Sequence, residues 1–396
     1  MKEPDSQISL LTAGRDRPYA LGLAAALAAA GARFDFVGSD EVDSPELHQS
    51  PQIRVLNLRG DQSVEAGLAR KIIRVLAYYG RLIRYAFTAR PKVFHILWNN
   101  KFEAFDRTVL MLLYKALGKK IVFTAHNVNA RARDGGDSWF NRATLKFQYR
   151  RCDQIFLHTE RMRRELISGF GVPESKTIVI PFGLNSTVPN SALTPADARH
   201  RLGLGARDKV LLFFGNIAPY KGVEYLVAAF LEIARRSDAY RLIIAGRPKG
   251  SEAYWAGILE QINASPARAQ FILKIEFVPD AETEIYFKAA DVLILPYTHI
   301  FQSGVLFLGY NFGLPAIAAD VGSLKDDIVE GRTGYVFRPR EAADLARVIE
   351  SYFSGEVYAH LPERREEIRE FARQRYSWSE VARITTGVYD RLLDAK

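Results

Sequence analysis

Short apolar runs alternate with longer amphipathic segments along the first half of the chain. Residues 8–12, 34–37 and 53–58 are such runs, and the segment between the first two predicts a helix at 21–30 that ends at Gly31. Apolar runs of about four to eight residues bounded by turn residues are typical of buried strands in parallel sheets. The same alternation predicts further strands at 93–98, 121–124, 153–158 and 177–180 and helices at 69–92 and 108–117. This order predicts a doubly wound α/β sheet.

A polar segment separates this half from a second one with the same pattern. Residues 185–204 contain Pro189 and Pro195, so we predict a linker there that ends in a short helix. Beyond it the pattern predicts strands at 209–214, 241–245, 275–277, 292–295 and 316–319 and helices at 222–234, 281–289, 305–312, 342–353 and 379–393. We therefore predict an N-terminal domain of residues 1–188 and a C-terminal domain of residues 189–375, both doubly wound.

Composition narrows the class of protein. Although 48% of the 396 residues are hydrophobic, no apolar run reaches the roughly 18–20 residues of a membrane span. The Ala-rich run at 20–30 follows several charged residues, so we expect no signal peptide. Cys152 is the single cysteine, which leaves no internal disulfide and no cysteine-based metal site and fits a reducing compartment. We expect a cytoplasmic protein.

Positive charge is concentrated in the first half. Residues 1–190 contain 28 Lys and Arg against 18 Asp and Glu, whereas the remainder is nearly neutral. In the predicted helix 69–92, basic side chains interleave with Ile, Leu and Tyr. Such a helix can lie on the anionic inner face of a membrane, or its apolar stripe can pack on its own sheet while its charges are solvated. No nucleic-acid-binding motif is present, so we do not expect nucleic acid as a partner.

Glycine-rich and polar residues follow the predicted strands of the second half, at the edge where open α/β sheets bind ligands. The segment FFGNIAPYKG at 213–222 places Lys221 after a loop, AGR at 245–247 follows a strand, and QSG at 302–304 precedes a helix. The amides of Ser303 and Gly304 at that helix start, with the helix dipole, suit a phosphate. Together with Lys221 they predict a diphosphate site without a metal, since these loops contain no Asp-x-Asp pair for Mg²⁺.

Four residues of the first half are predicted at the corresponding edge of its sheet. His126 and Asn127 follow the strand at 121–124, and Gly14 and Arg15 lie in the turn after the first strand. We predict that they line a ligand-binding site at this edge. The G-x-G-x-x-G fingerprint of dinucleotide-binding folds is absent.

A family resemblance is carried by four segments of the second half: FFGNIAPYKGVEYLVAAF, ADVLILPY, FGLPAIAADVG and EGRTGYVF. In the first half FTAHNV carries a looser resemblance. They resemble the retaining glycosyltransferases of the GT-B fold known as family 4. The resemblance implies two Rossmann-like domains facing a cleft, a nucleotide-diphosphate sugar bound mainly by the C-terminal domain, and a last helix, about 376–396, that crosses back to the N-terminal domain. It also implies that Lys221 contacts the diphosphate and that His126 lies near the donor sugar and the reaction centre. The site formed by Gly14, Arg15, His126 and Asn127 is then the acceptor and sugar side.

Two positions depart from the family pattern by losing a carboxylate. Ile300 and Leu308 stand where the family has glutamates that hold the sugar hydroxyls and the ribose. Neither side chain accepts a hydrogen bond, and losing such a contact costs roughly 1–3 kcal/mol. His299 or Gln302 could supply the missing contact.

A third departure is the loss of a charge. Asn216 stands where the family has an arginine, and the resemblance suggests that Arg247 compensates. The predicted donor site therefore consists of Asn216, Lys221, Gly246, Arg247, His299, Gln302, Ser303, Gly304 and Leu308.

We expect a retaining glycosyltransferase that moves a sugar from a UDP- or GDP-sugar to a glycan or lipid-linked acceptor in surface polysaccharide or glycolipid assembly. In the chemistry that the resemblance implies, the leaving diphosphate helps to deprotonate the acceptor and the protein stabilises the charge on that diphosphate. We expect no cofactor and no metal. Two alternatives stay open: a catalytically weakened partner subunit that binds sugar nucleotides or glycans, which Ile300 and Leu308 motivate, and a sugar-nucleotide epimerase on the same fold.

Overall fold

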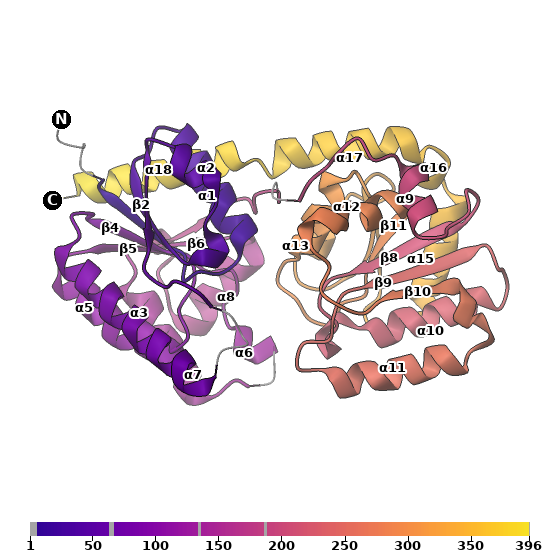
Figure 1. Ribbon diagram of the computed structural model, residues 1–396, viewed down its shortest axis with the longest axis horizontal. Coiled ribbons are helices and arrows are strands. Elements are labelled where there is room, and N and C mark those ends of the chain that lie inside the picture. Colours follow the sequence, from indigo (N-terminus) through magenta and orange to yellow (C-terminus); the bar gives the residue numbers. More distant parts are fainter. Residues whose placement is uncertain (1–5, 63–66, 134–135, 186–187, 396) are drawn as a thin grey trace. The chain divides into compact units, whose positions relative to one another are not determined.

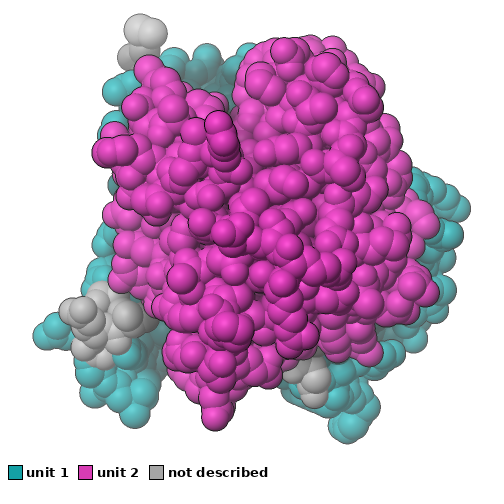
Figure 2. Space-filling view, turned by 90° about the vertical axis from the view of Figure 1, so that its right-hand side faces the viewer, with its two compact units in different colours: residues 1–183, 376–396 teal, residues 184–375 magenta. Residues whose placement is uncertain are grey.

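The computed structural model describes residues 6–62, 67–133, 136–185 and 188–395. The chain forms two compact units, unit 1 (residues 1–183 and 376–396) and unit 2 (residues 184–375), which Figure 2 shows in two colours. The division after Gly183 precedes the predicted boundary by five residues. Each unit is an α/β sheet flanked by helices (Figure 1), so the prediction of two doubly wound sheets is confirmed.

Unit 1 contains a seven-stranded sheet in which all strands are parallel. Its order is β3-β2-β1-β4-β5-β6-β7, so the direction of winding reverses between β1 and β4. The strands are β1 (Ile8–Leu11), β2 (Phe34–Gly38), β3 (Ile53–Asn57), β4 (Val93–Ile96), β5 (Lys120–Thr124), β6 (Gln154–Leu157) and β7 (Thr177–Val179). Four of them, β1, β2, β4 and β6, are buried along their whole length, as expected for a parallel sheet covered on both faces.

Helices cover both faces of this sheet (Figure 1). α1 lies with α18 over one face, and α3, α5 and α7 lie over the other. The helices are α1 (Arg17–Ala29), α2 (Pro45–Gln49), α3 (Leu68–Thr88), α4 (Glu103–Phe105), α5 (Met111–Ala116), α6 (Ala130–Arg133), α7 (Trp139–Arg151), α8 (Glu160–Phe170) and α18 (Trp378–Asp394). Within the described ranges no helix combines the length and apolarity that crossing a bilayer requires.

The last helix, α18, belongs to unit 1 although unit 2 precedes it in the chain. The indole of Trp378 lies where a Cβ on Gly22 or Gly183 would stand, so both positions need glycine for this helix to pack. Further along, the hydroxyl of Tyr389 lies 2.6 Å from Nδ1 of the buried His95 on β4. The predicted return of the last helix to the N-terminal sheet is therefore confirmed.

Unit 2 contains a six-stranded parallel sheet in the order β10-β9-β8-β11-β12-β13, which reverses between β8 and β11. The strands are β8 (Lys209–Phe214), β9 (Tyr240–Ala245), β10 (Phe271–Lys274), β11 (Val292–Leu295), β12 (Ala316–Ala319) and β13 (Gly334–Phe337). The helices are α9 (Pro195–Arg201), α10 (Val223–Ala234), α11 (Glu252–Ala264), α12 (Asp280–Ala289), α13 (Gly304–Asn311), α14 (Leu324–Asp327), α15 (Ala342–Ser354), α16 (Glu356–Ala359) and α17 (Leu361–Arg375).

One strand predicted in unit 2 is misplaced. The strand predicted at 275–277 lies four residues earlier, as β10, because its pairing with β9 ends where the carbonyl of Lys274 accepts from the amide of Gly246. Phe277, which suggested a buried strand, is 62% exposed. The predicted linker ends in a short helix, as expected. This helix is α9, which packs on α12, and the guanidinium of its Arg199 pairs with Asp291 at 2.7 Å. Residues 186–187 of that linker lie outside the described residues.

The helix predicted at 69–92 is α3, and only part of its apolar stripe packs on unit 1. Towards its C-terminal end Tyr79, Leu82 and Tyr85 are buried against unit 1, as in a helix that packs on its own sheet. Near its N-terminal end the apolar side chains are exposed, by 75% at Leu68 and 66% at Ile73. That end is therefore an apolar surface surrounded by basic side chains.

Candidate functional site

The candidate site of unit 2 lies where the winding of its sheet reverses, between β8 and β11. In open α/β sheets the loops that follow these two strands flank a crevice in which ligands bind. The loop after β8 continues into a short 3₁₀ helix, Pro219–Lys221, and α10 follows it. The amide of Thr298, after β11, donates to the carbonyl of Tyr220 at 2.9 Å and joins the two loops.

Lys221 and Ser303 meet on one tyrosine. The ammonium of Lys221 lies 3.9 Å from the ring centroid of Tyr297, and the hydroxyl of Ser303 donates to the hydroxyl of Tyr297 at 3.3 Å. All three side chains are buried. A positive charge over an aromatic face is stabilised by about 0.5–2 kcal/mol, so Tyr297 holds the ammonium in place. The sequence does not single out Tyr297, because it reads as the continuation of an apolar strand.

Glycines allow the loops of this site to approach one another closely. A Cβ on Gly246 would lie 1.8 Å from the carbonyl oxygen of Gly215, and one on Gly222 would lie 2.0 Å from that of Pro296. Gly246 and Gly222 also have positive φ angles, 149° and 63°, which disfavour other residues. The backbone itself therefore forms the walls at this edge of the sheet.

The N-terminus of α13 is part of this arrangement. Ser303 precedes the helix with a buried side chain that makes no capping hydrogen bond, and Gly304, the first helical residue, is exposed. The first amides of a helix have no partner within it, and the helix dipole adds partial positive charge there. The side chain of Ser323 fixes the preceding loop by donating to the carbonyl of Phe301 at 2.9 Å.

The other residues predicted for the donor side are more exposed. Asn216, Arg247 and His299 are exposed, and the guanidinium of Arg247 lies 5.4 Å from the ring centroid of Phe277. Gln302 is half-buried, and its Oε1 atom is buried without a hydrogen-bond partner among the described residues. A buried oxygen in that state is free to accept a hydrogen bond from a ligand.

The two positions that lack family glutamates are integrated into the core. Ile300 and Leu308 are 9% and 6% exposed. The carbonyl oxygen of Ile300 lies 2.0 Å from the position that a Cβ on Gly322 would take, and the φ of Gly322 is 61°. Carboxylates at such buried positions would need hydrogen-bonding partners. The apolar side chains therefore suit the packing of this chain.

In unit 1 the predicted His126 lies inside a cluster of rings. Its imidazole is stacked on Trp98 with centroids 4.3 Å apart, and the ring of Tyr19 meets it edge-on at 4.6 Å. Nδ1 of His126 lies 3.2 Å from Nε2 of His158, so the two rings share one hydrogen bond. The Nε2 atom of His126 is buried without a partner in the described part of the chain. The hydroxyl of Tyr19 and Nδ1 of His158 are in the same state, so the cluster has three polar atoms that could hydrogen-bond to a ligand.

Burial keeps these imidazoles neutral. Burial, assisted by the charges of His158 and His95, holds the pKa of His126 well below its ordinary value. Burial also lowers the pKa of His158 to about 4. A neutral imidazole can donate or accept one hydrogen bond to a sugar hydroxyl, but it does not offer a positive charge.

The remaining predicted residues of unit 1 surround this edge of its sheet. Gly14 is in the left-handed conformation with φ of 61°, and its carbonyl accepts from Nε2 of Gln62 at 2.9 Å. Arg15 is exposed, and Asn127 is half-buried beside His126. No group of three His, Cys, Asp or Glu side chains in the described ranges is arranged to hold a metal ion.

Comparison with solved structures defines the class of the fold. Sucrose-phosphate synthase of Thermosynechococcus elongatus superposes with a TM-score of 0.77 over 98% of this chain and 100% of that one, at 19% identity. HepE of Anabaena, solved with UDP and glucose, gives a TM-score of 0.73 over 97% and 99%, at 16% identity. The fold is that of the GT-B glycosyltransferases.

Two family models match the sequence. One, described as glycosyl transferases group 1, matches residues 208–354, and the other, described as glycosyltransferase family 4, matches residues 18–188. Together they take in most of the chain, which belongs to the group 1, family 4 glycosyltransferases.

A curated relative is the D-inositol 3-phosphate glycosyltransferase of Kineococcus radiotolerans, which is 31% identical over 188 residues. The match covers 46% of this chain and 43% of that protein, so the chain spans less than half of the relative's length.

Proposed function

We propose that this protein is a retaining glycosyltransferase that moves a sugar from a nucleotide-diphosphate donor, a UDP- or GDP-sugar, to a glycan or lipid-linked acceptor without a metal. The observation that carries the proposal is the convergence of Lys221 and Ser303 on Tyr297, at the N-terminus of α13. HepE, which shares the fold, has been solved with UDP-glucose, and this supports a uridine nucleotide as the donor.

The proposed chemistry places the largest demand on the leaving group. As the bond between the sugar carbon and the phosphate oxygen breaks, its electron pair stays on the diphosphate. Lys221 and the first amides of α13 stabilise that negative charge, and a preorganised donor of this kind is worth about 10²–10³ in rate. The proton of the acceptor hydroxyl passes to a diphosphate oxygen while the new bond to the sugar forms on the same face.

Unit 1 supplies hydrogen bonds to this reaction. His126 offers a neutral Nε2 atom without a partner among the described residues, which orients a hydroxyl of the sugar or of the acceptor, and Asn127 supports it. Two other predicted donor contacts, Gln302 and Arg247, replace family residues that this chain lacks. No step of this scheme needs a metal ion or a cofactor.

We also propose that the protein acts at the anionic inner surface of a membrane through the N-terminal end of α3. Leu68, Ile72, Ile73 and Leu76 expose between 50% and 75% of their surface. Apolar side chains flanked by Lys and Arg are typical of helices that lie in a membrane interface. Flotation with vesicles tests this: Ile73→Gln lowers recovery with phosphatidylserine vesicles, while Val109→Gln, an exposed apolar residue elsewhere in unit 1, leaves it unchanged.

Donor hydrolysis tests the enzymatic proposal. We expect slow release of UDP or GDP from a nucleotide sugar, and a loss of about 10²–10³-fold in rate for Lys221→Met, which keeps the stem but not the charge. Lys249→Met removes an exposed lysine near the same edge of the sheet and leaves the rate unchanged. Equal rates in the two variants would contradict the role of Lys221.

The same variants distinguish the alternative of a partner subunit, which the buried Ile300 and Leu308 favour. A partner subunit keeps its phenotype in cells with Lys221→Met, whereas an enzyme loses it. Release of an isomerised nucleotide sugar without any acceptor would instead indicate an epimerase.

A further inference from the structure

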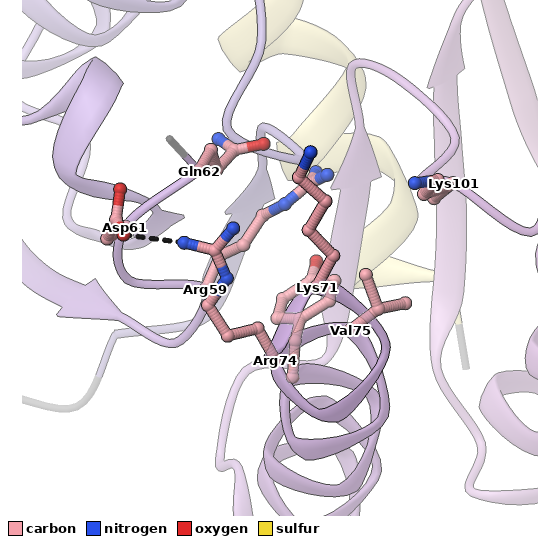
Figure 3. A pocket seen from close by; sticks show the side chains of 8 residues that line it. Arg59, Asp61, Gln62, Lys71, Arg74, Val75 and Lys101 are labelled. Atoms are coloured by element: carbon pink, nitrogen blue, oxygen red, sulfur yellow. Dashed lines mark hydrogen bonds and ion pairs between the residues drawn. The ribbon is translucent and has the colours of Figure 1, made fainter. Parts of the chain in front are cut away.

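Unit 1 contains a basic pocket that none of the predicted site residues lines (Figure 3). It has a volume of about 220 Å³, far more than the roughly 10–15 Å³ that one water requires. It is lined by Arg59, Asp61, Gln62, Lys71, Arg74, Val75, Tyr78 and Lys101. Four of these side chains are cationic and one is acidic.

The pocket lies where the winding of the seven-stranded sheet reverses, between β1 and β4. The guanidinium of Arg59 donates to the carbonyl of Ala13, and Nε2 of Gln62 donates to the carbonyl of Gly14 at 2.9 Å, so both are tied to the turn after β1. Lys101 belongs to the loop after β4. This is the position in the sheet at which open α/β folds bind ligands, and the turn after β1 is the one predicted for the acceptor side.

One face of α3 completes the pocket. Lys71, Arg74, Val75 and Tyr78 follow one another at helical spacing, while the exposed apolar Ile72, Ile73 and Leu76 lie on the adjacent face of the same helix. The basic pocket and the apolar surface proposed to contact a membrane are therefore neighbours.

Half of the cationic groups are fixed in place. The guanidinium of Arg59 lies 5.4 Å from the ring centroid of Tyr78, which is buried and donates to Oδ1 of Asn100 at 2.5 Å. Arg74 pairs with Asp61 at 2.5 Å, the ion pair drawn in Figure 3. Fixed guanidinium groups suit phosphate and carboxylate oxygens, because their donors already have the required direction.

The other two cationic groups, those of Lys71 and Lys101, are not paired with an acidic side chain in the part of the chain that the structure describes. Within the described ranges neither Lys71 nor Lys101 forms an ion pair or a side-chain hydrogen bond, and among the residues that line the pocket Asp61 alone opposes the four positive charges. Like charges gathered in one hollow repel each other, and an anion that enters the hollow relieves this repulsion. A solvated basic surface would need neither the hollow nor the fixed partners of Arg59 and Gln62.

We propose that this pocket binds the anionic group of the acceptor, a phosphate or a carboxylate, so that the protein glycosylates acidic acceptors. The assignment of the anion to the acceptor rests on the proposed function, but the existence of the anion site does not. The same chemistry is present in a soluble sugar phosphate and in the headgroup of an acidic lipid.

Calorimetry with inorganic phosphate and with glycerol 3-phosphate tests the site. We expect binding to the full-length protein, weakened at least tenfold in Lys71→Gln and in Lys101→Gln. Arg70→Gln is the matched control, because it removes the same charge from the adjacent, exposed position of α3 that does not line the pocket; it changes the affinity less than twofold. Equal weakening by Arg70→Gln and Lys71→Gln, or no binding of either anion, would overturn the proposal.

Vesicles distinguish the sources of the anion. If the acceptor is a lipid, binding to phosphatidylcholine vesicles that contain phosphatidic acid falls more in Lys71→Gln than in Arg70→Gln; if it is soluble, only the calorimetric difference appears. Equal losses on vesicles together with no soluble binding indicate surface charge alone and refute the pocket. UDP binding by the wild-type protein, measured in parallel, reports on the proposed function separately from the pocket.

Discussion

The edge of the sheet at which ligands are expected to bind is built differently in the two units. In unit 2 the edge is formed by backbone: Gly215, Gly222 and Gly246 bring loops into contact, and one lysine is buried among them. In unit 1 it is formed by side chains: the rings of Trp98, His126 and neighbouring residues stack, and basic side chains line a pocket at the turn after β1.

Under the proposed function, this difference follows from what each edge recognises. Backbone amides and a helix N-terminus suit one constant group, a diphosphate, whatever nucleotide carries it. Side chains can be exchanged without altering the backbone, so they suit a partner that differs between relatives. Under the proposed function, unit 2 therefore binds the part of the donor that nucleotide sugars have in common, and unit 1 binds the acceptor.

The largest expected effect follows from the close contact in unit 2. Gly246→Ala places a Cβ where the carbonyl of Gly215 stands, at a φ of 149°, so we expect a loss of about 4 kcal/mol or more in the free energy of unfolding of unit 2. Denaturant unfolding followed by hydrogen exchange with mass spectrometry measures it for each unit.

A matched glycine separates close contact from backbone strain. Gly250 has a positive φ of 72°, but no atom lies within 4 Å of the position that its Cβ would take, so Gly250→Ala is expected to cost only about 1–2 kcal/mol. If the two variants lose equal stability, the close approach of the loops is not what requires Gly246.

The second expected effect concerns pH and unit 1. Burial lowers the pKa of His95 to about 3 and that of His158 to about 4, whereas His200 and His360 of unit 2 are exposed. Between pH 6.5 and these values the unfolded chain binds protons that the folded chain does not. The contribution of these histidines to stability is therefore complete above pH 6.5 and falls as the pH decreases, by about 1.4 kcal/mol per pH unit for each histidine.

Hydrogen exchange as a function of pH checks this prediction. At pH 4.5 we expect His95 to cost unit 1 about 3 kcal/mol, and this loss to be absent in His95→Gln, whose stability is compared with its own value at pH 7. An identical pH dependence of the wild type and the variant would show that His95 is not the group that titrates.

The same comparison explains which parts of the protein can be predicted from sequence. The loops of unit 2 are consecutive residues directly after apolar strands, so Lys221 and Ser303 stand out along the chain. The pocket of unit 1 draws on separate segments, and Arg59 and Lys101 have no local pattern that marks them. Tyr297 is missed for a third reason, because a tyrosine at the end of an apolar strand is usually part of the core.

The element boundaries show the same limit. Most strands are located within one or two residues, since burial on both faces produces continuous apolar runs. The strand expected at 275–277 is misplaced because the apolar Phe277, which is exposed, suggested a buried strand. The helix α17 was not predicted because most of its residues are charged. The local pattern of apolar residues indicates which segments are buried, so it does not predict a helix that has few apolar side chains.

The third expected effect is the contribution of Asp106 to the stability of unit 1, whose pH dependence is opposite to that of the buried histidines. Burial raises the pKa of Asp106 to about 6; its Oδ1 atom accepts from Tyr79 and Asn100, and its Oδ2 atom is buried without a partner in the described residues. The folded state therefore holds a proton that the unfolded chain loses near pH 4. This group loses stability as the pH rises from about 4 to 6, by about 2 kcal/mol, and the loss remains above pH 6.

Asp106→Asn checks this prediction, because the amide retains an oxygen for Tyr79 and cannot ionise. We expect the change in unfolding free energy between pH 4 and pH 8 to differ from that of the wild type by about 2 kcal/mol in favour of the variant at high pH. If both proteins follow the same pH profile, the carboxyl group of Asp106 is ionised in the folded protein.

The smallest expected effect sharpens the role of the ring beneath Lys221. Tyr297→Leu removes the aromatic face that lies 3.9 Å from the ammonium, so we expect UDP affinity to fall by about five- to tenfold, or about 1 kcal/mol. Tyr297→Phe keeps the face and loses the hydroxyl that accepts from Ser303, so it retains affinity within about twofold. Calorimetry with UDP distinguishes the two interpretations. If phenylalanine is as harmful as leucine, the hydroxyl and the loop before α13, rather than the ring, position the charge, and the backbone then determines the position of the buried Lys221 as well.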